Sequence, residues 1–321
     1  GWFYTLMAIG TLLFGRAPFE NCLVMGHVQD KDGIKMSKHK GNVVEPWSVL
    51  DAQGADAVRW YFYANGAPWL PARFSGDLVR DMQRKFMGTL WNTYAFYVLY
   101  AEIDGFDPTK HELVRENLSA MDRWLLSRLN TLVREVDENL AHYRITEGAR
   151  EIARFTDDLS NWYVRRCRER FWGSGMTTDK EAAYMTLYTA LRTMAHLCAP
   201  YTPFLSEQIY QNIVRGVDPA APESVHLCDF PAADESLIDA ALERDMDAAL
   251  EIVVLGRSAR NQAARKNRQP LARMFVQGKR LGGMFVAIIA DELNVKAVEF
   301  VEDASAFISY KAKPQLKTLG P

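Results

Sequence analysis

The segment DGIKMSKHKGN concentrates positive charge in a short stretch bounded by glycines. Lys35, Lys38 and Lys40 lie within six residues, between Gly33 and Gly41. A lysine ammonium is a compact, mobile charge, which suits a phosphate group whose negative charge grows during a reaction. Glycine-flanked loops can close over a ligand after it has bound. The pattern therefore favours phosphate chemistry in which positioned cations stabilise a leaving group.

A solvated surface loop is the alternative, because most lysine-rich loops have no other role. Two neighbours argue against it: Met36 is an apolar residue inside the charge cluster, and Ser37 adds a hydroxyl group. The preceding apolar run NCLVMGHV, residues 21–28, is typical of a buried parallel strand. Ligands of such sheets bind at the carboxyl ends of the strands, where the lysine loop would lie.

Helical patterns dominate the rest of the chain. Residues 1–14 predict a helix, residues 45–64 predict two short helices divided at Gly54, and residues 75–101 predict a longer one. Beyond Ser119, apolar residues recur at helical spacing in four segments with short joints, which predicts an antiparallel bundle. These segments are 119–143, 146–172, 179–198 and the one that begins at Thr202-Pro203.

The carboxyl-terminal part has a different periodicity. A long helix is expected from about Ser236, and after Pro270 the pattern becomes strand, helix, strand. The segment AFISYKA, residues 306–312, is a possible further strand. These elements predict a small α/β unit at the end of a mainly helical chain.

Composition limits the possible partners. The 321 residues carry a net charge of −2, so contact with nucleic acid must come from local basic patches. The four cysteines are far apart, which argues against a zinc ribbon or a disulfide framework, and no metal site is predicted. No apolar run reaches the length of a membrane span. We expect no membrane contact, a cytoplasmic protein and a monomer.

Two basic segments could bind RNA. NWYVRRCRERFW combines four arginines with aromatic residues on both sides, and arginine forks suit phosphates while aromatic faces suit unstacked bases. The alternative is that the aromatic residues are core and the arginines form a solvated face. The stretch from Arg257 to Arg273 contains no acidic residue, which favours a phosphate backbone over a solvated helix. The candidate tRNA contacts are Trp162, Arg165, Arg166, Arg168, Arg257, Arg260, Arg265, Lys266 and Arg268.

The motif KMSKH, from Lys35 to His39, resembles the second signature loop of class I aminoacyl-tRNA synthetases, which usually ends in serine. Lys35 and Lys38 match the motif lysines, and the resemblance implies that they are catalytic and hold the ATP phosphates. ATP would bring Mg²⁺ with it. The ATP-binding residues that the resemblance implies are Gly26, His27, Val28, Lys35, Met36, Ser37 and Lys38.

The flanking segments resemble the isoleucyl branch of that family. GADAVRWY carries the D-A-x-R pattern with Asp56 and Arg59, and GWFYTLM, DLSNWYVRRCRERFW and NQAARKNRQPL are similar to isoleucyl enzymes. The resemblance implies an isoleucine–tRNA ligase with ATP, isoleucine and tRNA(Ile) as partners. It also implies that Trp2 faces the isoleucine side chain, whereas without it a core tryptophan would be the preferred reading.

The first nucleotide motif of the family is missing, since none of the six histidines stands in a His-x-Gly-His pattern. We therefore expect a carboxyl-side fragment that also lacks the editing domain and is inactive alone. The alternatives are a non-catalytic RNA-binding module that resembles a synthetase, and a valyl- or leucyl-tRNA synthetase.

The expected fold is multidomain and mainly α. It would comprise the end of a Rossmann-type catalytic domain with the lysine loop (1–45) and a connecting, stem-contact helical region (46–115). An anticodon-binding helical bundle (116–269) and a small, truncated α/β unit (270–321) would follow.

Overall fold

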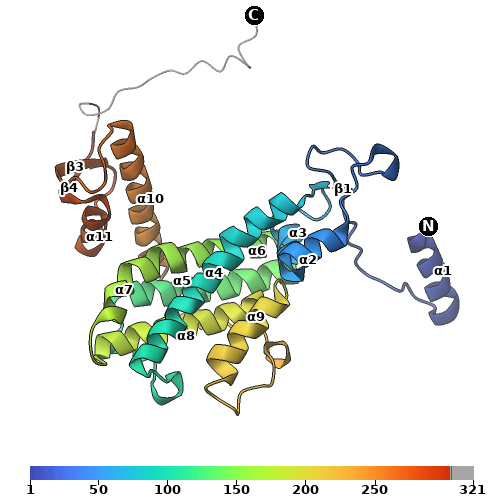
Figure 1. The fold of residues 1–321 in the computed structure, drawn as a ribbon, viewed down its shortest axis with the longest axis horizontal. Coiled ribbons are helices and arrows are strands. Elements are labelled where there is room, and N and C mark those ends of the chain that lie inside the picture. The colour runs from blue at the N-terminus through green and yellow to red at the C-terminus, as the bar shows by residue number, and fades with distance from the viewer. Residues whose placement is uncertain (304, 306–321) are drawn as a thin grey trace, which may run out of the picture. The chain divides into compact units, whose positions relative to one another are not determined.

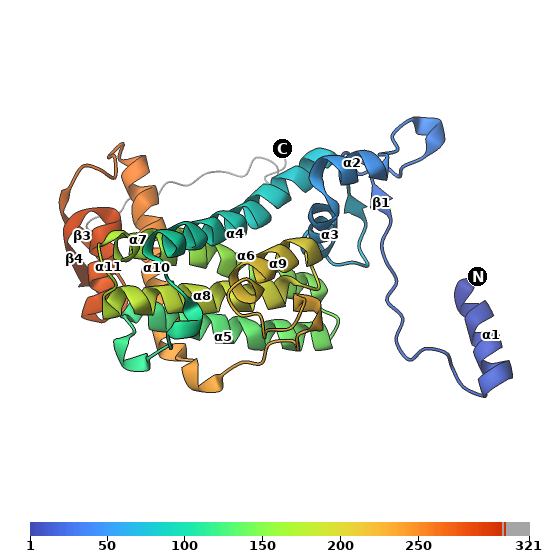
Figure 2. The same cartoon turned by 60° about the horizontal axis from the view of Figure 1, so that its bottom comes forward.

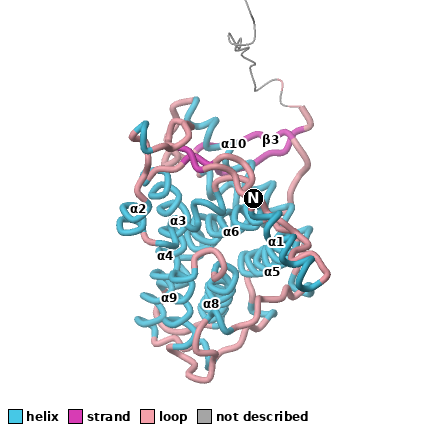
Figure 3. The backbone as a smooth tube through the Cα atoms, turned by 90° about the vertical axis from the view of Figure 1, so that its right-hand side faces the viewer, coloured by secondary structure: helices cyan, strands magenta, loops and turns pink. Residues whose placement is uncertain are grey.

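The computed structural model describes residues 1–303 and 305. Figure 1 shows a mainly helical chain, and Figure 3 shows how little of the described backbone is strand. The chain divides into two compact units, Gly1–Ile238 and Asp239–Pro321. The mainly helical class expected from the sequence is confirmed. The described chain has no helix long and apolar enough to cross a membrane.

The first segment contains helix α1 (Trp2–Phe14), as predicted, which ends at Gly15 in the left-handed conformation. The strand predicted over residues 21–28 is wrong except at its end, because β1 comprises only Val28–Gln29. A strand extends only as far as it has a hydrogen-bonding partner. Here that partner is the equally short β2 (Ala72–Arg73), which pairs with β1 in parallel.

Three helices pack together beside this strand pair. Helices α2 (Pro46–Gln53) and α3 (Ala55–Ala64) are divided at Gly54 as predicted, and φ of 84° at that residue explains why glycine stands there. Helix α4 (Gly76–Asp104) begins where the Ser75 hydroxyl accepts a hydrogen bond from the backbone of Leu78. Val49, Ala57, Tyr61, Phe74 and Val79 form one buried apolar cluster between these elements.

The predicted bundle is formed by long helices that run side by side in Figures 1 and 2. Helix α5 begins with a capping box, in which the Ser119 and Asp122 side chains accept hydrogen bonds from each other's backbone N–H groups. The predicted second helix is continuous but changes its winding from α to π and back. The helical elements are α5 (Ala120–Ala141), α6 (Ile145–Asp157), a π-helix (Asp158–Val164), α7 (Arg165–Trp172), α8 (Thr178–Cys198), α9 (Pro203–Tyr210) and a second π-helix (Gln211–Arg215).

Short 3₁₀ turns link these helices. One of them begins where the Ser224 hydroxyl accepts a hydrogen bond from the His226 N–H. The 3₁₀ segments are Lys38–Lys40, Pro108–Lys110, Arg115–Asn117, Val225–Leu227 and Glu235–Leu237.

The second unit contains α10 (Ala240–Gln262), β3 (Leu271–Gln277), α11 (Gly283–Leu293) and β4 (Val295–Val301). The strand–helix–strand order after Pro270 is confirmed, and β3 pairs with β4 in parallel, with Leu271 opposite Val295. Helix α11 connects the two strands and packs against α10. The possible strand at residues 306–312 lies outside the described residues.

Candidate functional sites

The lysine loop follows β1 directly, at the carboxyl end of a strand that is paired in parallel. The chain turns back at once, because Gln29 and Lys35 form an antiparallel bridge and the Gly33 N–H donates to the Asp30 carbonyl at 3.0 Å. Lys35 and Lys38 are both exposed. Among the described residues no ion pair holds either ammonium group. The two lysines are thus available to a ligand.

Met36 and Ser37 fix the loop between the two lysines. The Met36 side chain packs against the buried cluster formed by Val49, Ala57, Tyr61, Phe74 and Val79. The Ser37 hydroxyl accepts a hydrogen bond from the Lys40 N–H at 3.3 Å and caps the short 3₁₀ turn that contains Lys38. The apolar residue inside the charge cluster is therefore an anchor to the helical core.

Gly26, His27 and Val28 lead into the loop, and part of their backbone is already paired. The Gly26 N–H donates to the Pro68 carbonyl at 2.7 Å, and the His27 carbonyl accepts from the Ala72 N–H at 2.9 Å. A Cβ atom at Gly26 would collide with the Leu70 carbonyl, which explains the glycine. The side chains of His27 and Val28 are exposed.

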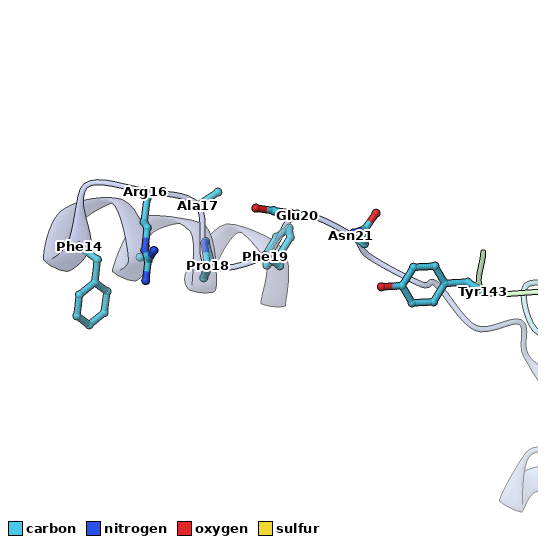
Figure 4. A pocket seen from close by; sticks show the side chains of 9 residues that line it. Phe14, Arg16, Ala17, Pro18, Phe19, Glu20, Asn21 and Tyr143 are labelled. Atoms are coloured by element: carbon cyan, nitrogen blue, oxygen red, sulfur yellow. The ribbon is translucent and has the colours of Figure 1, made fainter. Parts of the chain in front are cut away.

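Trp2 lies at the start of α1 and is 87% exposed. Trp2 is therefore not a core residue in this structure, which the alternative interpretation expected. Figures 1 and 2 both show α1 lying apart from β1, which leads into the lysine loop. Beside α1 lies an open hollow whose lining includes none of the predicted site residues. Figure 4 shows the lining residues, which are Gly10, Phe14, Arg16, Ala17, Pro18, Phe19, Glu20, Asn21 and Tyr143.

The arginine-rich helix α7 has an exposed face and a buried one. Arg165 and Arg168 are exposed, and Arg166 is partly buried. Trp162 is 4% exposed in the preceding π-helix, and both Arg165 and Arg166 lie over its ring, at 5.7 and 5.6 Å from the centroid. Trp162 is therefore a core residue, as the alternative interpretation expected, and its ring has no free face for a base. Its ring would instead position the two arginines.

Arg170, in the same run of arginines, points into the bundle. Its two terminal nitrogens donate to the two carboxylate oxygens of Asp122 at 2.7 and 2.9 Å. Asp122 is fully buried and also accepts from the Tyr163 hydroxyl. Burial alone would raise the pKa of the Asp122 carboxyl, but the bonds and charge of Arg170 outweigh it and hold that pKa below its ordinary value.

The basic stretch of the second unit also separates into two groups. Arg260 is 6% exposed and donates to the Leu293 and Lys266 carbonyls, and Arg257 pairs with Glu292 at 2.5 Å. These two arginines connect α10 to its neighbours. Arg265, Lys266 and Arg268 lie in the exposed loop between α10 and β3. They present charge to solvent, as do the side chains of Arg257, which is 46% exposed beside Glu292, and Arg273, which is 65% exposed.

Sequence reasoning noticed Asp56 and Arg59 as a motif but missed what they do. The Asp56 carboxylate accepts from the Leu205 N–H at 2.7 Å, in the first turn of α9. Arg59 donates to the Pro200 carbonyl at 2.7 Å, just beyond the end of α8. Burial raises the pKa of the Asp56 carboxyl. One turn of α3 thus supplies caps to the α8–α9 corner, which only a long-range contact could reveal.

Comparisons with known proteins agree with this architecture. Residues 1–69 match the family of tRNA synthetases class I (I, L, M and V), and residues 122–275 match the anticodon-binding domain of tRNA ligase. The isoleucine–tRNA ligase of Clostridium acetobutylicum is 57% identical over the whole chain. That of Thermus thermophilus is 46% identical over 326 aligned residues. The chain spans 31% of the length of each.

Two solved structures have a similar fold. The LeuRS of Agrobacterium radiobacter, solved as a ternary complex with tRNA and LeuAMS, gives a TM-score of 0.57 at 20% identity over 74% of this chain and 27% of its own. The methionyl-tRNA synthetase of Mycobacterium tuberculosis, in complex with methionyl-adenylate, gives 0.50 at 18% identity over 64% of this chain and 43% of its own. The class that the two family models and the folds define is the class I aminoacyl-tRNA synthetases. Within that class, this chain belongs to the isoleucyl-tRNA synthetases, of whose length it spans about a third.

Proposed function

We propose that the chain is the section of an isoleucine–tRNA ligase that places two lysines at the ATP phosphates and binds tRNA(Ile). The observation that carries the proposal is the lysine loop itself. It lies at the carboxyl end of a parallel strand, and its two motif lysines are exposed. The isoleucyl relatives match across the whole chain, which supports isoleucine as the amino acid.

In the proposed reaction the isoleucine carboxylate attacks the α-phosphate of ATP, and pyrophosphate leaves with the electrons of the broken P–O bond. Lys35 and Lys38 would stabilise the negative charge that grows on the leaving group. ATP would arrive with Mg²⁺ on its phosphates. The described residues contain no cluster of three His, Cys, Asp or Glu side chains that could hold a metal. Trp2 is proposed to face the isoleucine side chain, with Gly26, His27 and Val28 beside the adenine.

The tRNA would contact basic residues that are exposed or, in the case of Arg166, partly buried. We propose Arg165, Arg166 and Arg168 on α7, and Arg265, Lys266 and Arg268 in the second unit, as the phosphate contacts. Arg257, whose side chain is 46% exposed, would be a further contact, and Trp162 and Arg260 would support these surfaces from within. We further propose the division into residues 1–45, 46–115, 116–269 and 270–321 in the roles stated above, as a monomer in the cytoplasm. The section would not activate an amino acid alone.

Pyrophosphate exchange by the complete enzyme tests the catalytic part. Lys35→Ala and Lys38→Ala should each lower isoleucine-dependent exchange by about 10²–10³-fold, the usual loss for one transition-state donor. Lys31→Ala removes an exposed lysine of the same loop outside the motif, and should change little. Exchange driven by valine or leucine but not isoleucine would identify a different synthetase. If no amino acid supports exchange, the alternative of a non-catalytic RNA-binding module would be favoured.

Binding of this chain to tRNA(Ile) at increasing salt tests the other part. Affinity should fall steeply between 50 and 200 mM salt, by about 10³-fold or more if roughly six phosphates are contacted. A flat salt dependence would contradict the proposed phosphate contacts.

A further inference from the structure

The lysine loop is tied together by two of its own side chains, Asp30 and Asn42. Asp30 stands at the end of β1 and is 9% exposed, and Asn42 follows the 3₁₀ turn at the far end of the loop. The Asn42 side-chain nitrogen donates to one Asp30 carboxylate oxygen at 2.7 Å. The loop therefore starts and ends at one side-chain hydrogen bond.

Each partner also binds the backbone inside the loop. The other Asp30 oxygen accepts from the Asp32 N–H at 3.0 Å and the Ile34 N–H at 2.8 Å, which fixes the tight turn before Lys35. These bonds, first among them that from Asn42, hold the pKa of the Asp30 carboxyl below its ordinary value. Asp30 is thus charged and engaged with N–H donors at neutral pH, and it is not the ion-pair partner of a loop lysine.

Asn42 holds the residues on both sides of Met36. Its side-chain oxygen accepts from the Ser37 N–H at 2.9 Å, and its nitrogen also lies 3.3 Å from the Lys35 carbonyl. The Met36 side chain is at the same time packed against the helical core. The backbone that carries Lys35 and leads to Lys38 is therefore fixed by side-chain bonds on one side and by apolar packing on the other.

We propose that Asp30 and Asn42 are positioning residues, which form a clasp that presents Lys35 and Lys38 to the phosphates as one preformed unit. This inference rests on the proposed function for its catalytic consequence, but the clasp itself can be tested without it. A preformed arrangement matters because electrostatic stabilisation is effective only when the charges do not have to be reorganised during the reaction. The motion expected of a glycine-flanked loop would then move the clasped unit as a whole.

Trypsin tests the clasp directly, since it cuts after lysine and needs an opened loop. Asn42→Ala in the full chain removes the bonds to Asp30 and Ser37, so cleavage after Lys35, Lys38 and Lys40 should accelerate about tenfold or more. Asp30→Asn should act in the same direction. Asp32→Asn is the matched control, because it removes an equal charge from an exposed position in the same turn. Unchanged cleavage in Asn42→Ala would overturn the clasp.

An exchange of the two side chains gives a sharper test. Asn42→Asp alone places two carboxylates face to face and should open the loop. The double variant Asp30→Asn, Asn42→Asp restores one amide donor and one carboxylate acceptor across the clasp. Its cleavage rate should return to within about threefold of the wild type. Thermal unfolding followed by tryptophan fluorescence should be alike in all variants, and a double variant as open as Asn42→Asp would refute the pairing.

The catalytic consequence is measured as pyrophosphate exchange in the complete enzyme. Asn42→Ala should lower kcat about tenfold or more with a smaller change in the KM for ATP, because the lysines remain but are not positioned. The double variant should recover most of that kcat. If Lys38→Ala leaves exchange intact, the proposed function fails while the tryptic result stands. If Lys38→Ala abolishes exchange and Asn42→Ala has the wild-type kcat, the positioning role fails alone.

Discussion

Replacing Asp122 by alanine should strongly destabilise the first unit. The carboxylate is fully buried, closes the capping box of α5 with Ser119, and receives two hydrogen bonds from Arg170 and one from Tyr163. Removing one partner of a buried ion pair costs about 3–5 kcal/mol, because the other charge is left uncompensated. Arg170 keeps its bond to Asp179 at 2.9 Å, so we expect about 3–4 kcal/mol.

Urea unfolding followed by tryptophan fluorescence measures this loss. All eight tryptophans lie at or before residue 172, so their emission reports the first unit alone. With an m-value of about 2–3 kcal/mol/M, the midpoint should fall by about 1–2 M. Asp81→Ala is the control, since its ion pair with Arg84 spans 3.9 Å with both side chains exposed and should contribute at most about 1 kcal/mol. A loss in Asp122→Ala no larger than in this control would refute the argument.

The stability difference between the wild type and Asp122→Ala should depend on pH in a defined direction. The pKa of Asp122 is lowered in the folded state, so the folded state binds its proton less readily than the unfolded chain. The contribution to stability is therefore present above the unfolded pKa of about 3.9 and lost as the pH falls through the folded value. The difference in free energy of unfolding between wild type and Asp122→Ala should be constant near neutrality and shrink below about pH 4. A difference that grows in acid would have the wrong sign.

Three further predictions concern other contacts. Asp56→Ala should lower the free energy of unfolding by about 1–2 kcal/mol, whereas Asp56→Asn, which keeps an oxygen for the α9 cap, should cost much less. Gly148→Ala places a Cβ 2.7 Å from the Tyr201 hydroxyl and should destabilise by about 1–3 kcal/mol, but in a Tyr201→Phe background it should be neutral or stabilising. Arg168→Ala should weaken tRNA binding without regard to base sequence and reduce the salt slope by about one.

Each of these has a result that would contradict it. Equal losses in Asp56→Ala and Asp56→Asn, measured by urea unfolding, would show that the cap bond is not what the carboxylate contributes. Additive effects of the Gly148 and Tyr201 substitutions would show that the hydroxyl is not the obstacle. An unchanged salt slope in Arg168→Ala, measured by fluorescence titration, would remove that arginine from the contacts.

Local patterns predicted the helices well. The division at Gly54, the start of α5 after Ser119 and the end of α8 at Cys198 are encoded within a few residues, so the sequence was sufficient for them. The strand before the lysine loop was overestimated, because its length depends on a partner more than forty residues away in the chain. The expected helix over 146–172 also did not include the change to π winding at Asp158–Val164, which is a rare local departure inside an otherwise helical segment.

The site residues divide in the same way. The sequence places Lys35 and Lys38 in a glycine-flanked loop, and the structure has both exposed there, because these features are local to the loop. The sequence could not predict which arginines face inward. Arg170 and Arg260 differ from their neighbours only in their distant partners, which are Asp122 and the Leu293 carbonyl. The role of Asn42 was missed for the same reason, although its place beside the motif was visible in the sequence.

The bonds from Asp56 and Arg59 to the α8–α9 corner matter for anyone who divides this molecule into pieces. The interval between residues 115 and 116 looks like a natural place to cut, and a bundle expressed from there would contain complete helices. It would nevertheless lack the Asp56 carboxylate, which accepts from the Leu205 N–H in the first turn of α9. It would also lack the Arg59 guanidinium, which donates to the Pro200 carbonyl beyond α8. A separately produced bundle therefore needs residues 54–66 as well, or replacement caps designed into the corner itself.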